Sequence, residues 1–291
     1  MKIGTFTPSV VDRSQRVDLG FGGLFVAERA PAEEVALPAL VLLHDLFLHH
    51  HAFARVAAAL AAARRVLAPD LPGCGDSDAP PPAACDDYRP RWIARVLLEC
   101  LEARQVGEVD LLAHGFGALV AAHLGELLGD RLRRLIVVAA PGGSGAPLGL
   151  LGRLPGFASR VLPRLATRDL LRRYLERAQA SSSSSIDEGA LALYWDRLAR
   201  PGGVEAAMAM LGHLGEPGLG ERLAALRRRA LVVWGSDDRL CPLVGGRRLA
   251  DALGAHLVVL DRCGHLPAEE APEALVECVD AFLAEAAPRA P

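Results

Sequence analysis

Short strand-like segments that alternate with helix-like segments constrain the fold of this chain more than any other feature. Apolar or nearly apolar runs occupy residues 39–43, 109–113, 135–139, 230–234 and 256–260. Runs of this length without regular polar alternation are typical of strands that are buried on both faces of a parallel sheet. Because helix-like segments separate most of these runs, the sequence predicts an α/β fold, with a mostly parallel, doubly wound sheet and helices on both faces.

The alternation stops after Pro141 and resumes near residue 230. Residues 148–213 contain helix-like, arginine-bearing sequence and a run of five serines, but no strand pattern. Single cores stop growing at roughly 250–300 residues, so a chain of 291 residues suits one core with an insert. We therefore expect residues 1–141 and 214–291 to form one sheet domain and residues 142–213 to form a helical cap. Phe157, Tyr194 and Trp195 are aromatic candidates in the cap for contacts with a substrate.

The composition is that of an ordinary globular protein, with 51% hydrophobic and 23% charged residues and a formal net charge of −3. This charge gives no reason to expect a nucleic-acid or membrane surface, so a small-molecule substrate is the expected partner. The apolar stretch 111–128 is interrupted by His114, His123 and Glu126, and no secretory signal precedes Asp12, which predicts a cytoplasmic protein without a membrane span. The six cysteines are scattered without a C-x-x-C pair and are expected to be reduced. No cofactor is predicted, and the oligomeric state is left open.

Four loops that follow predicted strands contain the residues of greatest chemical interest. In open α/β sheets, ligands bind beyond the carboxyl ends of the strands, which makes these loops the candidate site. They are residues 44–46, 113–117, 235–238 and 263–265, with the sequences HDL, AHGFG, GSDD and CGH.

With the stretches around them, these loops resemble the α/β-hydrolase superfamily, of the type with a helical cap after the sixth strand. The resemblance covers almost the whole chain and implies a mostly parallel, doubly wound sheet of the eight-stranded type. The matching stretches are 42–44 (LLH), 70–78 (DLPGCGDSD), the strand-turn-helix at 109–128, 234–242 (WGSDDRLCP) and 263–267 (CGHLP). Each stretch alone is weak, but five of them in order are specific.

The resemblance implies an acid and a base for catalysis. The family places its nucleophile first, then the acid and then a histidine along the chain. The acid corresponds to Asp238, with Asp237 as its rival, and the base corresponds to His265. A neutral imidazole takes a proton from the nucleophile or from water, and the carboxylate fixes its tautomer and supports the imidazolium.

The turn that should carry the nucleophile departs from the family. The family usually has serine at the centre of a small-x-nucleophile-x-small turn, and here that position is Gly115. Ala113 and Gly117 are the small flanking residues, and His114 and Phe116 are the intervening ones. Glycine has no nucleophilic side chain, but it suits a positive φ, so we expect the turn to survive.

The oxyanion loop departs from the family as well. The family usually has glycine after the histidine corresponding to His44, and here the residue is Asp45. By correspondence, the oxyanion hole would be formed by the backbone N–H groups of Leu46 and Phe116. Three interpretations of Asp45 are open: it repels a developing oxyanion, it acts as an acid/base group, or it is a turn-stabilising residue that faces solvent. His44, Asp45 and His114 are expected to line the substrate site.

Two other features are interpreted as non-catalytic. Ser144 lies in the only relaxed G-x-S-x-G match, but the glycines and Pro147 around it argue against a helix there, so we expect a loop or pocket-lining residue. The three successive histidines at 49–51 point in different directions and have no spaced Cys or carboxylate partner, so no metal site is predicted.

Three functions fit these residues. The preferred hypothesis is an enzyme acting on a small organic ester, thioester or related carbonyl compound, in which His265 and Asp238 act as a general base without a serine nucleophile, by direct hydrolysis, elimination or cyclisation. One alternative is a serine ester hydrolase inactivated by a Ser-to-Gly change, and the other is a ligand-binding homologue without catalysis. Asp45 favours the first, because a change of the nucleophile alone would leave the oxyanion loop in its usual form.

Overall fold

The structure is a computed structural model that describes residues 10–33, 35–141, 166–180 and 187–285. Its centre is a nine-stranded sheet in the order β1-β3-β5-β4-β6-β7-β8-β9, with β2 paired to β3. The strands are β1 Val10–Asp12, β2 Gln15–Leu19, β3 Gly22–Pro31, β4 Ala39–Leu43, β5 Val66–Pro69, β6 Val109–His114, β7 Leu132–Val138, β8 Arg229–Gly235 and β9 His256–Leu260.

The strand directions confirm the predicted mostly parallel, doubly wound sheet. Strands β4 to β9 pair in parallel, whereas β1, β2 and β5 each pair with β3 in antiparallel register. The sheet has one strand more than the eight-stranded type that the resemblance implies. The extra edge strand, β1, has three exposed residues, so no buried apolar pattern marks it in the sequence.

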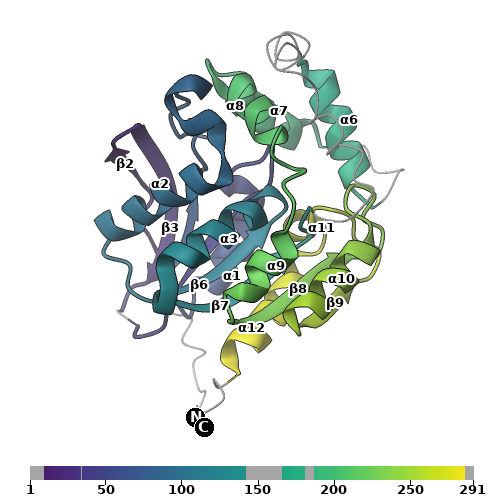
Figure 1. Cartoon of the computed structure of the whole chain (residues 1–291). Helices are drawn as coiled ribbons and strands as arrows, with labels where there is room; N and C mark the ends of the chain where they lie inside the picture. Colours follow the sequence, from purple (N-terminus) through teal and green to yellow (C-terminus); the bar gives the residue numbers. More distant parts are fainter. Residues whose placement is uncertain (1–9, 34, 142–165, 181–186, 286–291) are drawn as a thin grey trace, which may run out of the picture.

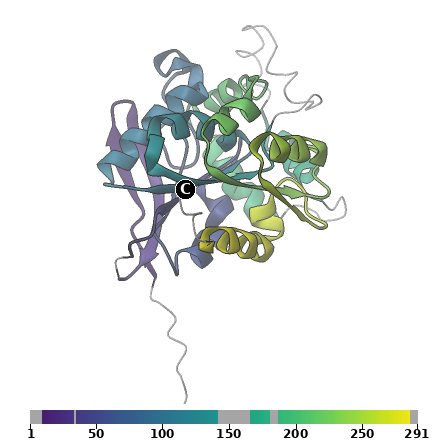
Figure 2. The same cartoon turned by 60° about the horizontal axis from the view of Figure 1, so that its bottom comes forward.

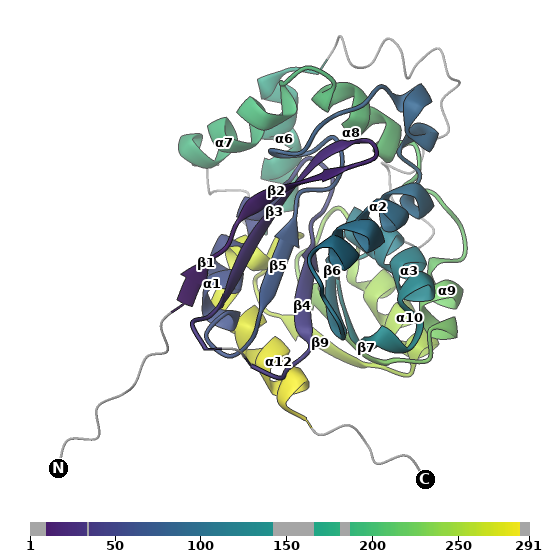
Figure 3. The same ribbon diagram turned by 90° about the vertical axis from the view of Figure 1, so that its left-hand side faces the viewer.

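Helices cover both faces of the sheet. One face carries α1 and α12, and the other carries α2, α3, α9 and α10 (Figure 3). The short helix α11 contacts both α1 and α12. The two layers are also separate when the molecule is turned to bring its bottom forward (Figure 2). The helices are α1 Ala54–Leu60, α2 Pro90–Ala103, α3 Phe116–Leu128, α6 Arg168–Ala178, α7 Glu188–Leu198, α8 Gly203–Leu211, α9 Leu219–Ala225, α10 Leu243–Leu253, α11 Pro267–Glu270 and α12 Pro272–Ala284, with short 3₁₀ turns at His50–Phe53, Pro82–Ala84, Asp86–Tyr88 and Gly129–Arg131.

Helices α6, α7 and α8 lie together at one end of the sheet, above the carboxyl ends of the parallel strands (Figure 1). Apolar side chains of α6 and α7 pack against residues of the loops that follow β4, β8 and β9. This cluster contains Leu48, Ala52, Leu171, Leu175, Ala178, Leu191, Tyr194, Leu240 and Leu266. The division of the chain into a core domain and a cap at 142–213 stays a prediction, and Phe157, Ser144 and the serine run lie outside the described residues.

Gly117 lets helix α3 pack closely against strand β4. A Cβ atom at this position would lie 2.5 Å from the backbone oxygen of Leu43, which has no freedom to move within the central sheet. We therefore expect Gly117→Ala to lower the free energy of unfolding by about 1–3 kcal/mol. Denaturant titration measures this loss, with Gly107→Ala as the matched control, because a Cβ at Gly107 meets nothing within 4 Å. Equal stability of the two variants would contradict the close approach.

Candidate active site

The turn between β6 and α3 places Gly115 at the centre of the site. Gly115 has φ of 52° and ψ of −121°, a positive φ that glycine adopts without strain. Its N–H donates to the carbonyl oxygen of Val138 at 3.0 Å, which ties the turn to strand β7. Helix α3 begins directly after it at Phe116, so the backbone N–H of Phe116 is one of the free donors of the first helical turn.

His265 and Asp238 meet across the carboxyl ends of β8 and β9. His265 Nδ1 lies 2.8 Å from Asp238 Oδ2, and both side chains are buried. Asp238 Oδ1 accepts hydrogen bonds from the backbone N–H groups of Leu240 at 2.9 Å and Cys241 at 2.8 Å, which hold the carboxylate in place. Asp237, the rival acid, is exposed. The geometry therefore suits an Asp238–His265 pair, whose catalytic role stays a prediction.

Asp45 approaches His265 from the side opposite Asp238. Its Oδ2 atom lies 3.1 Å from His265 Nε2, and its Oδ1 atom accepts the backbone N–H of Phe116 at 2.5 Å. The hydroxyl of Tyr174, on helix α6, donates to Asp45 Oδ2 at 3.3 Å. Asp45 is only 3% exposed, so it is a buried member of the site and not a turn residue that faces solvent.

The Asp45 carboxylate also occupies the space that a side chain at residue 115 would need. A Cβ atom built on Gly115 would lie 1.9 Å from Asp45 Oδ1 and 2.0 Å from Asp45 Cγ, distances at which atoms overlap. Glycine at 115 and aspartate at 45 therefore fit each other. The two departures from the family pattern, which are 70 positions apart, form a single arrangement in space.

The two carboxylates control the charge of His265. Burial lowers the pKa of His265, but hydrogen bonds to Asp238 and Asp45 outweigh that cost and raise the pKa to about 10. Burial raises the pKa of Asp45, but the hydrogen bond and the charge of His265 outweigh it and hold the pKa below its ordinary value. At neutral pH the site therefore contains an imidazolium between carboxylates.

His265 is expected to remain protonated through neutral pH and to titrate near pH 10. Because its folded pKa is raised, the stability it contributes is fully present below its ordinary pKa of 6.5 and is lost as pH rises toward 10. Asp45→Asn removes one anionic partner and should lower the titration midpoint. Imidazole chemical shifts measured by NMR against pH report both midpoints, and a midpoint near 6.5 in the unmodified protein would contradict the charge state.

His44 and His114 are connecting residues of the site. His44 Nε2 accepts the N–H of Leu71 at 2.9 Å and its Nδ1 lies 2.8 Å from the carbonyl of Asp45, so it fixes the loop after β4. His114 Nε2 lies 2.7 Å from the carbonyl of His265, and burial lowers the pKa of His114 to about 4. Both imidazoles are therefore neutral and hold the loops that carry Asp45 and His265.

The predicted oxyanion hole is altered by Asp45. The N–H of Phe116 donates to Asp45 instead of facing an open site. Leu46, the other predicted donor, is buried directly after Asp45.

Tyr174 is a site residue that was not predicted from the sequence. Its only signal is its place on the face of α6 that carries Leu171 and Leu175.

Among the residues that the structure describes, two groups bring potential metal ligands within 4.8 Å of one another: Asp45, His114 and His265, and His49, His50 and Asp70. The histidine run therefore has a carboxylate partner, Asp70, although none was predicted from the sequence. Asp70 Oδ1 accepts the backbone N–H of His50 at 2.7 Å and lies 2.9 Å from His50 Nδ1, while Oδ2 accepts the N–H of Asp76 at 2.8 Å. His265 and His50 are thus each hydrogen-bonded to a carboxylate of their own group, whereas His49 Nε2 is buried without a hydrogen-bond partner among the described residues. The absence of a metal stays a prediction.

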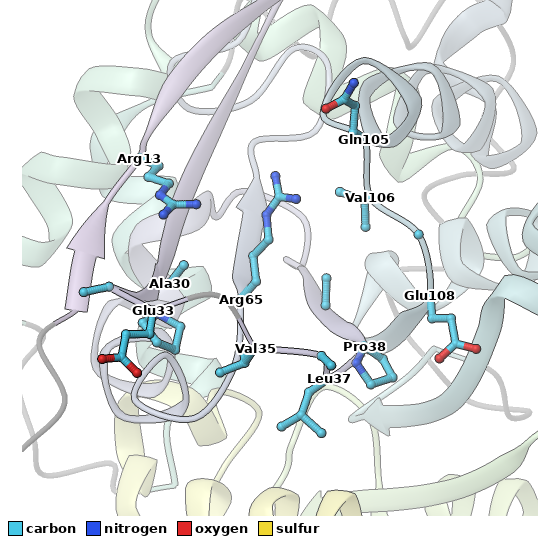
Figure 4. A pocket seen from close by; sticks show the side chains of 15 residues that line it. Arg13, Ala30, Glu33, Val35, Leu37, Pro38, Arg65, Gln105, Val106 and Glu108 are labelled. Atoms are coloured by element: carbon cyan, nitrogen blue, oxygen red, sulfur yellow. The ribbon is translucent and has the colours of Figure 1, made fainter.

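A hollow of about 520 Å³ lies at the other end of the sheet, by the start of β4 (Figure 4). Arg13, Glu33, Arg65 and Glu108 surround it. The Arg65 guanidinium is bound to Glu28 at 2.9 and 3.1 Å. No residue of the Asp45–His265–Asp238 group lines this hollow, so it is separate from the candidate site.

Across the described ranges, none of the helices has the length and apolar character that a membrane crossing requires. All six cysteines are free in the structure, and their reduced state stays a prediction.

The parallel sheet, the tight β6–α3 turn and the Asp–His pair beyond the strands define an α/β-hydrolase fold. The chain belongs to the alpha/beta hydrolase family, because the sequence pattern of that family matches residues 40–278. The 2-hydroxymuconate semialdehyde hydrolase of Pseudomonas putida is 30% identical over 231 residues, which cover 77% of this chain and 78% of that protein. The pimeloyl-(acyl-carrier protein) methyl ester esterase of Aeromonas salmonicida is 31% identical over 255 residues, which cover 84% of this chain and 95% of that protein. A solved hydrolase from Pseudomonas aeruginosa has a TM-score of 0.78 at 22% identity, covering 94% of this chain and 99% of that one.

Proposed function

We propose that the chain is an enzyme that acts on a small organic ester, thioester or related carbonyl compound without a serine nucleophile. His265, supported by Asp238, transfers the protons of the reaction, as an acid in its resting charge state and as a general base once it has given up its proton. The proposal includes a cytoplasmic location, a small-molecule substrate and a helical cap over residues 142–213 that covers the site.

The observation that carries this proposal is the position of the Asp45 carboxylate. It fills the space beside Gly115 and contacts both the imidazole of His265 and the N–H of Phe116. A serine at residue 115 would need these same two partners for its proton and its oxyanion. The relatives support the substrate class, since one is a semialdehyde hydrolase and another a methyl ester esterase.

The two alternatives are weaker on the same geometry. A serine hydrolase inactivated only at residue 115 would originally have held a serine whose Cβ lay 1.9 Å from Asp45 Oδ1. A pure binding protein has no need of a buried imidazolium between carboxylates, because burying charges costs several kcal/mol per ion before pairing. Neither alternative therefore explains why the Asp45 carboxylate occupies the space beside Gly115.

Turnover of a panel of aryl esters, thioesters and diketones by the unmodified protein tests the proposal. His265→Gln should lower the rate by about 10²–10⁴, the typical contribution of a general acid–base group. His256→Gln, at an exposed histidine at the start of β9, is the matched control and should retain full activity. An unchanged rate in His265→Gln would refute the role of His265. If the unmodified protein turned over none of the probes, the proposal that it is an enzyme would be refuted.

A further inference from the structure

We propose that Asp45 is the covalent nucleophile of this site and that its Oδ2 atom accepts an activated acyl group from a thioester or from an aryl or enol ester. This inference rests on the proposed function, because it names the nucleophile and the substrate class of the same site. It assigns to the loop after β4 the task that Gly115 has no side chain to perform.

The position of the carboxylate is that of a nucleophile. Its Cγ atom lies within 2.0 Å of the point where the Cβ of a residue at 115 would stand, so the carboxylate begins where a nucleophilic side chain from the β6–α3 turn would begin. Its two oxygens differ in how tightly they are held. Oδ1 is bound by Phe116 at 2.5 Å, whereas the contacts of Oδ2 with His265 and Tyr174 are longer, at 3.1 and 3.3 Å. The two longer hydrogen bonds of Oδ2 are the ones that a substrate can displace, and one of them comes from the proton that His265 gives to the leaving group, so we assign the attack to Oδ2.

The ionisation of Asp45 suits a nucleophile better than a base. The hydrogen bond from His265 overcomes burial and lowers the pKa of Asp45, so the group is an anion at neutral pH but a weak proton acceptor. A general base works best when its pKa lies near the working pH. A carboxylate nucleophile needs only to be ionised and correctly placed, and Asp45 meets both conditions.

In the first step, Oδ2 attacks the acyl carbon and the bond from that carbon to the leaving sulfur or oxygen breaks. His265 Nε2 gives its proton to the departing atom. The products are a mixed anhydride on Asp45, a neutral thiol, phenol or enol, and a neutral His265. Thiols and phenols have ordinary pKa values of about 8.5 and 10, so their anions leave readily and accept the proton of His265. Alkoxides are far more basic, so simple alkyl esters are poor substrates.

In the second step, the anhydride is hydrolysed. Acylation removes the negative charge of Asp45, and with it one of the two interactions that hold the proton on His265. Neutral His265, held by Asp238, then accepts a proton from water while the water oxygen attacks Asp45 Cγ and the substrate carboxylate leaves with Oδ2. The oxyanion develops on Oδ1, where the N–H of Phe116 already donates. Asp45 releases the second water proton to the solvent and regains its charge, so the net reaction adds one water to one acyl compound.

A labelling experiment on the full-length protein tests this route. Nitrophenyl acetate and S-phenyl thioacetate are mixed with excess enzyme in water enriched in heavy oxygen, and the digested enzyme and the released acetate are analysed by mass spectrometry. The peptide containing Asp45 should gain one heavy oxygen, while the acetate carries the original oxygen of Asp45. A parallel reaction quenched with hydroxylamine should convert Asp45 to its hydroxamate.

Variants of Asp45 and Asp237 distinguish the covalent role of Asp45 from the proposed function as a whole. Asp45→Asn and Asp45→Ala should lose the label and at least about 10³ in rate, whereas Asp237→Asn, at an exposed neighbour of the site, should retain both. Turnover that labels only the acetate, with neither heavy oxygen nor hydroxamate on Asp45, would overturn the inference and leave the proposed function standing. Absence of turnover with every acyl probe would overturn both.

Discussion

The double variant Gly115→Ser/Asp45→Gly is expected to become a serine hydrolase of activated aryl esters. Asp45→Gly clears the carboxylate that lies 1.9 Å from the position of the new Cβ, and it restores the glycine that is usual in the family after the histidine of this loop. The N–H of Phe116 and His265 Nε2 are then free for the oxyanion and for the new hydroxyl. A serine nucleophile contributes roughly 10⁶ in comparable enzymes, so we expect a gain of at least about 10³ over the single Gly115→Ser variant. A burst of nitrophenolate equal to the enzyme concentration measures the acyl-enzyme.

The single variant Gly115→Ser provides the decisive comparison. Its Cβ overlaps the Asp45 carboxylate, so it should be less stable than the unmodified protein by about 1–3 kcal/mol and should show no burst. Adding His265→Ala to the double variant should remove the burst again. If Gly115→Ser alone were as active as the double variant, the space beside residue 115 would be open and the match between the two positions would be wrong.

Asp238→Asn is expected to lower the turnover of any substrate by about 10⁴, because the amide no longer supports the imidazolium or fixes its tautomer. The backbone donors of Leu240 and Cys241 would still hold the side chain in place, so the protein should stay folded and the loss of rate should appear in kcat. The melting temperature should also fall, because the buried imidazolium loses one of its two carboxylate partners. Steady-state kinetics and thermal melting measure the two effects separately.

Asp237→Asn is the matched control for that prediction. Asp237 is next in the chain and carries the same carboxylate, but it is exposed and lies 3.1 Å from the hydroxyl of Ser236. Its substitution should change the rate by less than a factor of about 2, in keeping with the small effects of surface changes. A larger loss in Asp237→Asn than in Asp238→Asn would reverse the assignment of the acid.

Much of the fold could be predicted because buried parallel strands are continuous apolar runs. Strand β4 has the predicted bounds, Ala39–Leu43, and all five of its residues are buried. Helix α3 begins at Phe116, directly after the turn glycine, and lies within the strand-turn-helix predicted for residues 109–128. The strand at Val10–Asp12 lies on an exposed edge, where pairing alone defines it.

The sequence predicts those residues of the candidate site that lie in a loop directly after a strand. Asp238 and His265 follow β8 and β9, and the sequence placed both on the correct edge of the sheet. The fit between Asp45 and Gly115 was not predictable, because the direction of a side chain across the sheet has no periodic signal. The available signal was the joint presence of two departures from one family pattern.

Tyr174, on helix α6, illustrates the same limit. It contacts Asp45 from a position 129 residues further along the chain, on a helix whose residues otherwise show an ordinary amphipathic pattern. Tyr194, which the sequence analysis did name, is buried in α7 and donates its hydroxyl proton to Glu269 instead. Aromatic residues on an apolar helix face look alike in sequence, and only the packing of α6 and α7 separates their roles.

The central claim is that the Asp45 carboxylate stands in place of a side chain at residue 115 and is ion-paired with His265. A crystal structure of the unmodified protein at better than about 1.2 Å tests it most directly, because hydrogens and carboxylate bond lengths are then observable. The account predicts two equal C–O bonds in Asp45, a hydrogen on His265 Nε2 that points at Oδ2, and Oδ1 at the N–H of Phe116. An Asp45 carboxylate that turns away from Gly115, with water bound to His265 Nε2 and to the N–H of Phe116, would contradict the claim.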